Sequence, residues 1–344
     1  MAHDASRRKL LAGAAAGLGL AATGAPLRAQ TPADWDKVIA AAKKEGRVVL
    51  YTGAVGIGFH HAIGRMFEKR HGIRVEVLEA RASELRERIR TEQAAGRFLG
   101  DVSHNGSTTT ALQAEAGTFQ PHGGLPGTAN LQPQFKADAL KAPIFVFNYG
   151  ILVNTKLVKP AEEPKSWLDL HHPRWKGRII SDDMRALGGG SVFFFATTDK
   201  FGRGFHDKLA AQNLVFTRDQ RASERRVAQG EFPIWIPQVY PNVPQMKGLP
   251  VKLVMPVEGA TYVGYDVAML KNAPNPNAAR LFMDYFLSEE AQLVYANTGH
   301  GVTVKGVVDK ASEEVKKLAG AKLLGTTDYR RQNEMLALAK EIYK

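Results

Sequence analysis

The chain of 344 residues contains no cysteine. In an oxidising compartment no disulfide can therefore form, and the hydrophobic core has to hold the fold alone. We also expect neither a cysteine-linked lipid anchor nor a thiolate metal centre. The sequence also lacks a Gly-x-Ser-x-Gly nucleophile elbow and a His-Glu-x-x-His zinc motif. Nothing in it favours a hydrolase, although catalytic triads need not be sequential.

Long runs of one charge are absent as well. The net charge is +12, and it falls to +9 without residues 1–29, which hold four basic residues and one acid. One highly charged stretch, RASELRERIR, mixes both signs, as solvated helix faces do. We therefore expect no nucleic-acid partner, and only a modest electrostatic preference for anions.

The first 29 residues are typical of an export signal. Ser6, Arg7 and Arg8 precede Leu10 and Leu11, and a run of small and apolar residues follows to about Ala25. This order resembles a twin-arginine signal, with Leu10 where Phe is usual. The alternative is a general secretory signal with two chance arginines. The run is too weakly hydrophobic for a membrane span, so we expect a free periplasmic protein.

The rest of the chain alternates strands and helices. Residues 48–51 form an apolar run, residues 59–67 show apolar spacing typical of a helix, and residues 73–78 return to a strand pattern. Such strand-helix-strand units predict parallel pairing. The pattern continues to a near-unbroken apolar strand over 142–158, and a further strand-turn-helix unit begins at Tyr262. This alternation predicts an α/β protein, and the length predicts two compact parts.

Four segments in this order resemble the periplasmic solute-binding proteins of ABC importers: ILVNTKLVKP, PKSWLDL, PRWKGRI and GYDVAMLKNAPNPNAARLFMDYFLSEEAQ. The similarity is to the branch with ferric-ion, phosphonate, sugar-phosphate, thiamine and polyamine binders. It implies the two-lobe type II fold, with a sheet flanked by helices in each lobe and a ligand cleft between them. It also implies a first lobe of residues 30–146 plus 264–302, and a second lobe of 147–263 plus 303–344. Lobe closure is expected about strands near Phe147 and Val263.

Polar residues gather where predicted strands end and helices begin, which is where open α/β sheets bind ligands. The loop after residue 51 has glycines in the order Gly-x-x-Gly-x-Gly, which is not the dinucleotide fingerprint, so we expect its free N–H groups to face a solute. Arginines and hydroxyl groups in the other loops favour an anion, and Asp182 and Asp183 could take an ammonium group. The predicted ligand-binding residues are Thr52, Gly53, Ala54, Ser83, Asn105, Ser107, Asp183, Arg185, Gly190, Ser191, Arg221, Tyr240 and Tyr265.

Two histidine pairs, His60-His61 and His171-His172, raise the question of a metal site. Adjacent helical residues point about 100° apart, so we expect surface or packing roles, with no metal ligand and no cofactor. Iron binders of the similar family carry two consecutive tyrosines near Tyr240, whereas here Pro241 follows that residue. This departure weakens the ferric-ion interpretation.

The sequence therefore predicts a monomeric, non-enzymatic solute-binding protein that takes a small organic anion: a phosphonate, a phosphate ester or a carboxylate. Its expected partners are that solute and an ABC permease in the inner membrane. The alternatives are a ferric-ion carrier of the same family and a periplasmic hydrolase.

Overall fold

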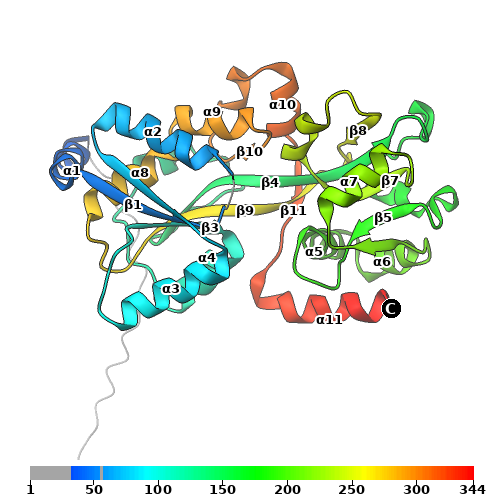
Figure 1. The fold of residues 1–344 in the computed structure, drawn as a ribbon, viewed down its shortest axis with the longest axis horizontal. Coiled ribbons are helices and arrows are strands. Elements are labelled where there is room, and N and C mark those ends of the chain that lie inside the picture. Colours follow the sequence, from blue (N-terminus) through cyan, green and yellow to red (C-terminus); the bar gives the residue numbers. More distant parts are fainter. Residues whose placement is uncertain (1–31, 55–56) are drawn as a thin grey trace, which may run out of the picture.

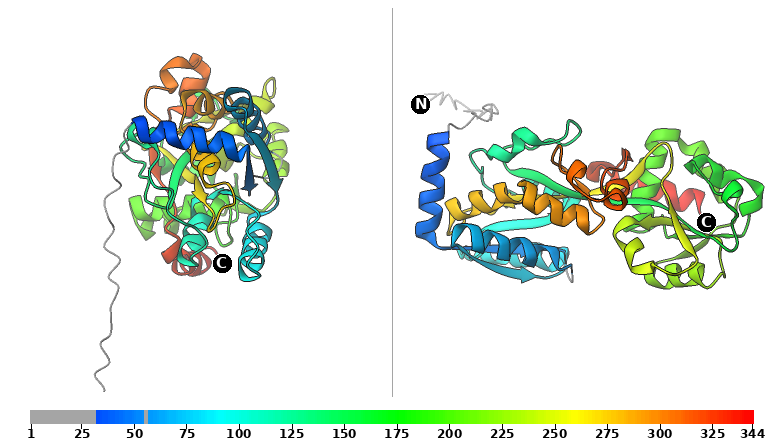
Figure 2. Two further views of the ribbon diagram at one scale, coloured as in Figure 1. Left: turned by 90° about the vertical axis from the view of Figure 1, so that its left-hand side faces the viewer. Right: turned by 90° about the horizontal axis from the view of Figure 1, so that it is seen from above.

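The computed structural model describes residues 32–54 and 57–344. The predicted signal peptide, residues 1–29, lies outside the described residues. Two α/β lobes lie side by side and are joined by extended strands (Figures 1 and 2). The predicted fold class, a two-lobe α/β protein with helices flanking the sheets, is confirmed.

One continuous path of strands runs through both lobes in the order β2-β1-β3-β9-β4-β7-β5-β6. The two long strands in the middle, β4 (Lys141–Asn154) and β9 (Ala260–Met269), pair antiparallel with each other. The C-terminal half of β4 pairs with β7 in the second lobe. The C-terminal half of β9 pairs with β3 in the first lobe. The stretch from Tyr262 therefore adds a strand to the sheet that contains β3, β1 and β2.

The first lobe is built on the parallel strands β2, β1 and β3, with helices on both faces (Figure 1). Its core joins aromatic side chains of α2, β4 and α8, among them Phe67, Phe145 and Phe282. Its strands are β1 (Arg47–Thr52), β2 (Arg74–Glu79), β3 (Val102–Gly106) and β10 (Gly301–Val302). Its helices are α1 (Pro32–Glu45), α2 (Phe59–His71), α3 (Ala82–Ala94), α4 (Ser107–Glu115), α8 (Pro276–Tyr285) and α9 (Glu289–Asn297).

The second lobe repeats the parallel arrangement in β7, β5 and β6. Its core includes Trp167, Phe193 and Phe205, together with Met335 and Tyr343 of the C-terminal segment. Its strands are β5 (Ile179–Asp182), β6 (Val215–Thr217), β7 (Ile234–Val239), β8 (Val251–Val254) and β11 (Leu323–Gly325). Its helices are α5 (Gly189–Phe201), α6 (Arg203–Ala210), α7 (Gln220–Ala228) and α11 (Gln332–Ile342).

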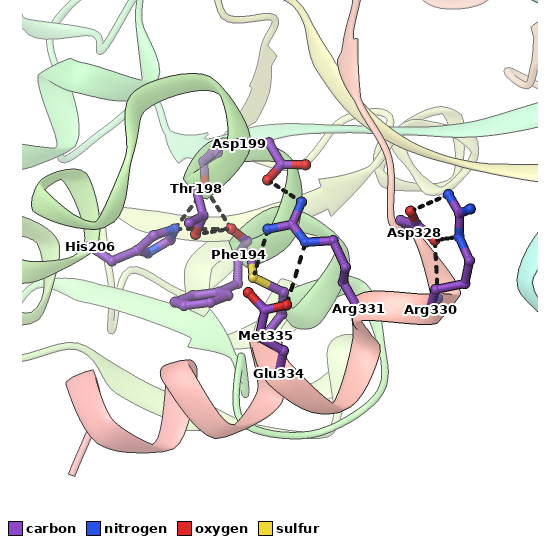
Figure 3. A network of polar contacts seen from close by, with 10 residues as sticks. Phe194, Thr198, Asp199, His206, Asp328, Arg330, Arg331, Glu334 and Met335 are labelled. Atoms are coloured by element: carbon purple, nitrogen blue, oxygen red, sulfur yellow. Dashed lines mark hydrogen bonds and ion pairs between the residues drawn. The ribbon is translucent and has the colours of Figure 1, made fainter.

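The C-terminal helix α11 packs on α5 and α6 of the second lobe. Figure 3 shows its polar attachment, in which Arg331 pairs with Asp199 of α5 at 3.0 Å. Before it, α10 (Glu313–Ala319) packs on α9 and β10, which belong to the first lobe. The boundary at residue 303 therefore stays a prediction.

Among the described helices, none is both long and apolar enough to cross a membrane.

Candidate functional site

Most of the predicted first-lobe residues come together around His104, at the carboxyl ends of β1 and β3. The hydroxyl of Thr52 and Nδ1 of His104 share a hydrogen bond of 2.6 Å, and the N–H of Gly53 donates to the His104 carbonyl at 2.9 Å. The ring of Tyr265 lies 5.7 Å from the His104 ring. Thr52, Asn105 and His104 are all fully buried, so they form the base of this region.

His104 itself was not among the predicted residues. Burial, reinforced by the nearby His60, lowers its pKa to about 3, so the ring is neutral at physiological pH. It positions the β1 and β3 ends through its contact with Thr52, and it adds no positive charge for an anion. Its place between Ser103 and Asn105, where a strand meets a helix, is the sequence signal that could have identified it.

Gly53 is required by a close approach within this cluster. A Cβ on residue 53 would lie 2.2 Å from the Oδ1 atom of Asn105 and 3.5 Å from the Cβ of Ala82. Asn105 is held in place because its Nδ2 donates to the Ser103 hydroxyl at 2.9 Å. The start of α3 therefore lies beside the loop, although Ser83 is exposed to solvent.

The N-terminus of α4 lies next to the strand that joins the lobes. Its first residue, Ser107, follows Gly106, which faces Tyr265 of β9 in the sheet register. Nearby, burial raises the pKa of Asp266, while Lys141, which donates to its carboxylate at 3.0 Å, and then Ser107 oppose that shift. The N-cap residues of α4 and α2 are Gly106 and Gly58, which have no side chain that could cap the helix. The first N–H groups of α4 therefore remain available to a negatively charged ligand.

Ser107 and Thr108 also line a groove of about 560 Å³ between α4, the joining strands and residues 326–330. The groove carries charges of both signs, and several of them are already paired, as in Lys141 with Asp266 and Arg330 with Asp328. The Thr108 hydroxyl lies 3.4 Å from that of Thr327, so the start of α4 touches the segment leading to α11.

The second-lobe residues form a separate cluster at the start of α5. One oxygen of Asp182 accepts from the Gly190 N–H at 2.7 Å, and the Ser191 hydroxyl bonds to the Gly188 backbone. Gly190 has no room for a side chain, because a Cβ there would lie 2.7 Å from the Asp182 carbonyl oxygen. Burial raises the pKa of Asp182, although the two backbone N–H groups on its carboxylate oppose that shift.

Tyr149 of β4 connects the two clusters. A Cβ on Gly189 would lie 3.0 Å from its ring, and its pKa is raised by burial, then by Tyr265 and by the charge of Asp182. Tyr149 therefore lies within electrostatic range of both the first-lobe and the second-lobe residues. It was not predicted, because it stands in the middle of an apolar strand.

Arg185 is engaged within its own lobe in this structure, and its role in binding the solute stays a prediction. Its guanidinium makes two hydrogen bonds to Asp183, at 2.8 and 3.2 Å, and a third to the carbonyl of Tyr343. It also lies over the Phe216 ring at 4.7 Å. Although burial would raise the pKa of Asp183, Arg185 holds it below its usual range. These contacts attach α11 to the second lobe.

Arg221 and Tyr240 also lie outside the two clusters. Arg221 is half exposed near the start of α7, 3.3 Å from Glu224. Tyr240 is fully buried against Ala260 and Leu318, and its hydroxyl has no hydrogen-bond partner among the described residues. The prediction that Tyr240 lines the pocket stays a prediction, and in this conformation close packing separates the phenol from solvent.

The structure also corrects the geometric argument about His60 and His61. Both side chains reach back to one oxygen of Glu79, with Nε2–Oε1 distances of 2.7 and 2.6 Å. Adjacent helical residues do diverge, but long side chains in the first turn of α2 can still converge on the end of β2. Glu79 lies 18 residues away in sequence, so the residue spacing gave no sign of this cluster.

Comparison with known proteins identifies the class. A family model described as "Bacterial extracellular solute-binding protein" matches residues 57–293, and the chain belongs to that family. The protein is therefore a solute-binding protein.

Individual relatives differ in what their names say they bind. A putative 2-aminoethylphosphonate-binding periplasmic protein of Salmonella typhimurium is 24% identical over 196 residues, covering 54% of this chain and 58% of the relative. Iron uptake protein A1 of Synechocystis sp. is 28% identical over 262 residues, covering 68% of this chain and 69% of the relative. A Trichodesmium structure, IdiA (FutA) in complex with iron and citrate ligands, has a TM-score of 0.73 at 21% identity, covering 87% of this chain and all of that one.

Proposed function

We propose that the protein captures a small organic anion of the phosphonate type between its lobes and delivers it to an ABC importer. The observation that carries this proposal is the N-terminus of α4, which lacks a side-chain cap and lies beside the joining strand β9. Free N–H groups and the helix dipole together favour a phosphonate or phosphate group at such a position. The neutral His104 behind it neither repels nor neutralises the anion.

The second lobe favours a solute that also carries a positive charge. Asp182 and Asp183 lie at the start of α5, and Arg185 already neutralises Asp183. Asp182 accepts from two backbone N–H groups of the described chain, and Arg218 acts on it only through its charge, so an ammonium group would add a charged hydrogen-bond donor. An aminophosphonate satisfies both lobes, and this agrees with the printed name of the Salmonella relative.

Capture would proceed by closure of the lobes about β4 and β9, the two strands that run through both. The closed, monomeric form would then dock on a permease in the inner membrane. The proposed periplasmic location rests on the sequence resemblance, on the twin-arginine-type signal of residues 1–29 and on relatives that are themselves periplasmic.

A ferric-ion carrier is the less favoured alternative. It would need accessible phenolate ligands, but Tyr240 is fully buried and Pro241 occupies the next position. A periplasmic hydrolase would need an accessible nucleophile and base, whereas the hydroxyl–imidazole pair of the first cluster, Thr52 and His104, is fully buried.

Titration calorimetry with 2-aminoethylphosphonate, inorganic phosphate and ferric citrate tests this proposal. We expect saturable one-to-one binding of the aminophosphonate, weaker binding of phosphate and no binding of iron. Mass spectrometry of the solute released by denaturing the purified protein provides an independent identification. Tight iron binding without phosphonate binding would contradict the proposal.

A further inference from the structure

A second group of ligand-type side chains lies in the first lobe, apart from the residues assigned to the solute. The atoms that His60, His61 and Glu79 offer to a metal all lie within 4.8 Å of one another. His60 is completely buried, the side chain of Glu79 is 24% exposed and that of His61 is 46% exposed. The group is therefore open to solvent on one side and anchored in the core on the other.

The chemical state of the group suits a metal ion. The His60 ring is fully buried and directs Nε2 to Oε1 of Glu79 at 2.7 Å. Its Nδ1 atom has no hydrogen-bond partner in the part of the chain that is described. The ring can therefore move its proton to Nδ1 and offer Nε2 to an ion without losing another hydrogen bond.

We propose that His60, His61 and Glu79 form a binding site for a divalent transition-metal ion, with two imidazole nitrogens, one carboxylate oxygen and an open fourth position. This ligand set suits Zn²⁺, which in open sites takes three protein ligands and one water or solute. Ligands about 2.0–2.1 Å from a tetrahedral Zn²⁺ are roughly 3.3 Å apart. The observed separations of 2.7 and 2.6 Å between the nitrogens and Glu79 Oε1 need to widen by less than about 1 Å.

The other histidine pair shows that adjacency alone does not produce this geometry. His171 packs on the ring of Phe205 at 4.7 Å, and Nδ1 of His172 accepts from the backbone N–H of Arg174 at 3.2 Å. No carboxylate joins these two rings within the described residues. The second pair therefore supplies a matched control for the first.

The experiment is a calorimetric titration of Zn²⁺ into untagged protein that has been stripped of metal with a chelator. We expect one equivalent to bind, with affinity lowered at least tenfold in each of His61→Ala and Glu79→Gln. His172→Ala should bind as the parent does. Because His61 is half exposed, its replacement should leave the fold intact, and thermal unfolding without metal checks this for every variant.

Absence of saturable Zn²⁺ binding to the parent would overturn the proposal. So would parental affinity in His61→Ala, or an equal loss in His172→Ala. Titration of 2-aminoethylphosphonate in the presence of chelator separates this site from the proposed solute site. Zn²⁺ binding without phosphonate binding would refute only the solute assignment, and the reverse result would refute only the metal site.

Discussion

The two lobes use the same strand-helix unit but treat the start of the helix differently. In the first lobe, α4 and α2 begin after glycine and have no side-chain cap. In the second lobe, Asp182 accepts from the N–H of Gly190 in α5, and Asp219 accepts from that of Ala222 in α7. A carboxylate at a helix start satisfies donors and offsets the positive end of the dipole. The starts of α4 and α5, the two helices of the proposed solute site, therefore differ in local charge, although α8 of the first lobe also begins at a carboxylate, that of Glu45.

This difference gives the proposed solute an orientation. Its phosphonate would meet the open N–H groups of α4, and its ammonium group would meet Asp182 across the joining strands. Tyr149 lies between them, within electrostatic range of both Asp182 and Tyr265. The following predictions test whether the two lobes offer opposite charges to the solute, as this orientation requires.

The largest effect is expected when the first lobe is made to resemble the second. Ser107→Asp would place a carboxylate at the start of α4, where it would satisfy the open N–H groups and repel the phosphonate. Placing like charges together costs several kcal/mol, so affinity for 2-aminoethylphosphonate should fall by roughly a hundredfold or more. Calorimetry measures the loss.

The control is Ser288→Asp at the start of α9, where the serine already caps the helix by accepting from Ala291. That variant should keep the parental affinity, because α9 is not part of the proposed site. Unchanged binding in Ser107→Asp would remove α4 from the solute site.

A smaller effect is expected from neutralising the second lobe. Asp182→Asn keeps an acceptor for the Gly190 N–H but removes the charge that would hold an ammonium group. A hydrogen bond to a charged group contributes about 1.5–3 kcal/mol, so 2-aminoethylphosphonate should bind about tenfold or more weakly. Methylphosphonate, which lacks the amino group, should bind parent and variant alike. An equal loss for both ligands would mean that Asp182 acts only through the structure of α5.

The loop after β1 provides a test of packing. Gly53→Ala would bring a Cβ to 2.2 Å from Asn105, so the loop or Asn105 must shift. Overpacking of this kind costs about 1–3 kcal/mol in the free energy of unfolding, which denaturant titration measures. Gly58→Ala, whose Cβ would meet no atom of the described residues within 4 Å, is the control and should cost less. Equal stability of the two variants would show that the contact with Asn105 is easily relieved.

The sequence predicted features that depend on residues close together in the chain. The late unit from Tyr262 was predictable because apolar spacing and the Asn275-Pro276 helix start are local, and the structure places β9 and α8 there. Thr52, Gly53 and Asn105 were predictable as a group, because the ends of neighbouring parallel strands meet at one edge of the sheet.

Contacts between distant segments could not be predicted in this way. Glu79, at the end of β2, contacts His60 and His61 at the start of α2. Tyr240 packs against Leu318, which is distant from it in sequence. No periodicity connects such positions. The sequence showed that these residues are polar or aromatic at element ends, but it did not show which neighbour each would find.

Arg185 should show the smallest effect on binding, although the sequence alone made it a prime ligand contact. Its guanidinium is already shared between Asp183, the Tyr343 carbonyl and the Phe216 ring, and only 30% of its side chain is exposed. Arg185→Ala should therefore change the affinity for 2-aminoethylphosphonate by no more than about twofold, far less than one charged contact contributes. The partly exposed ion pair contributes at most about 1 kcal/mol, so the free energy of unfolding should fall only slightly. A tenfold loss of affinity with unchanged stability would instead mean that Arg185 leaves Asp183 when the lobes close, and that the second lobe also offers a positive charge to the solute.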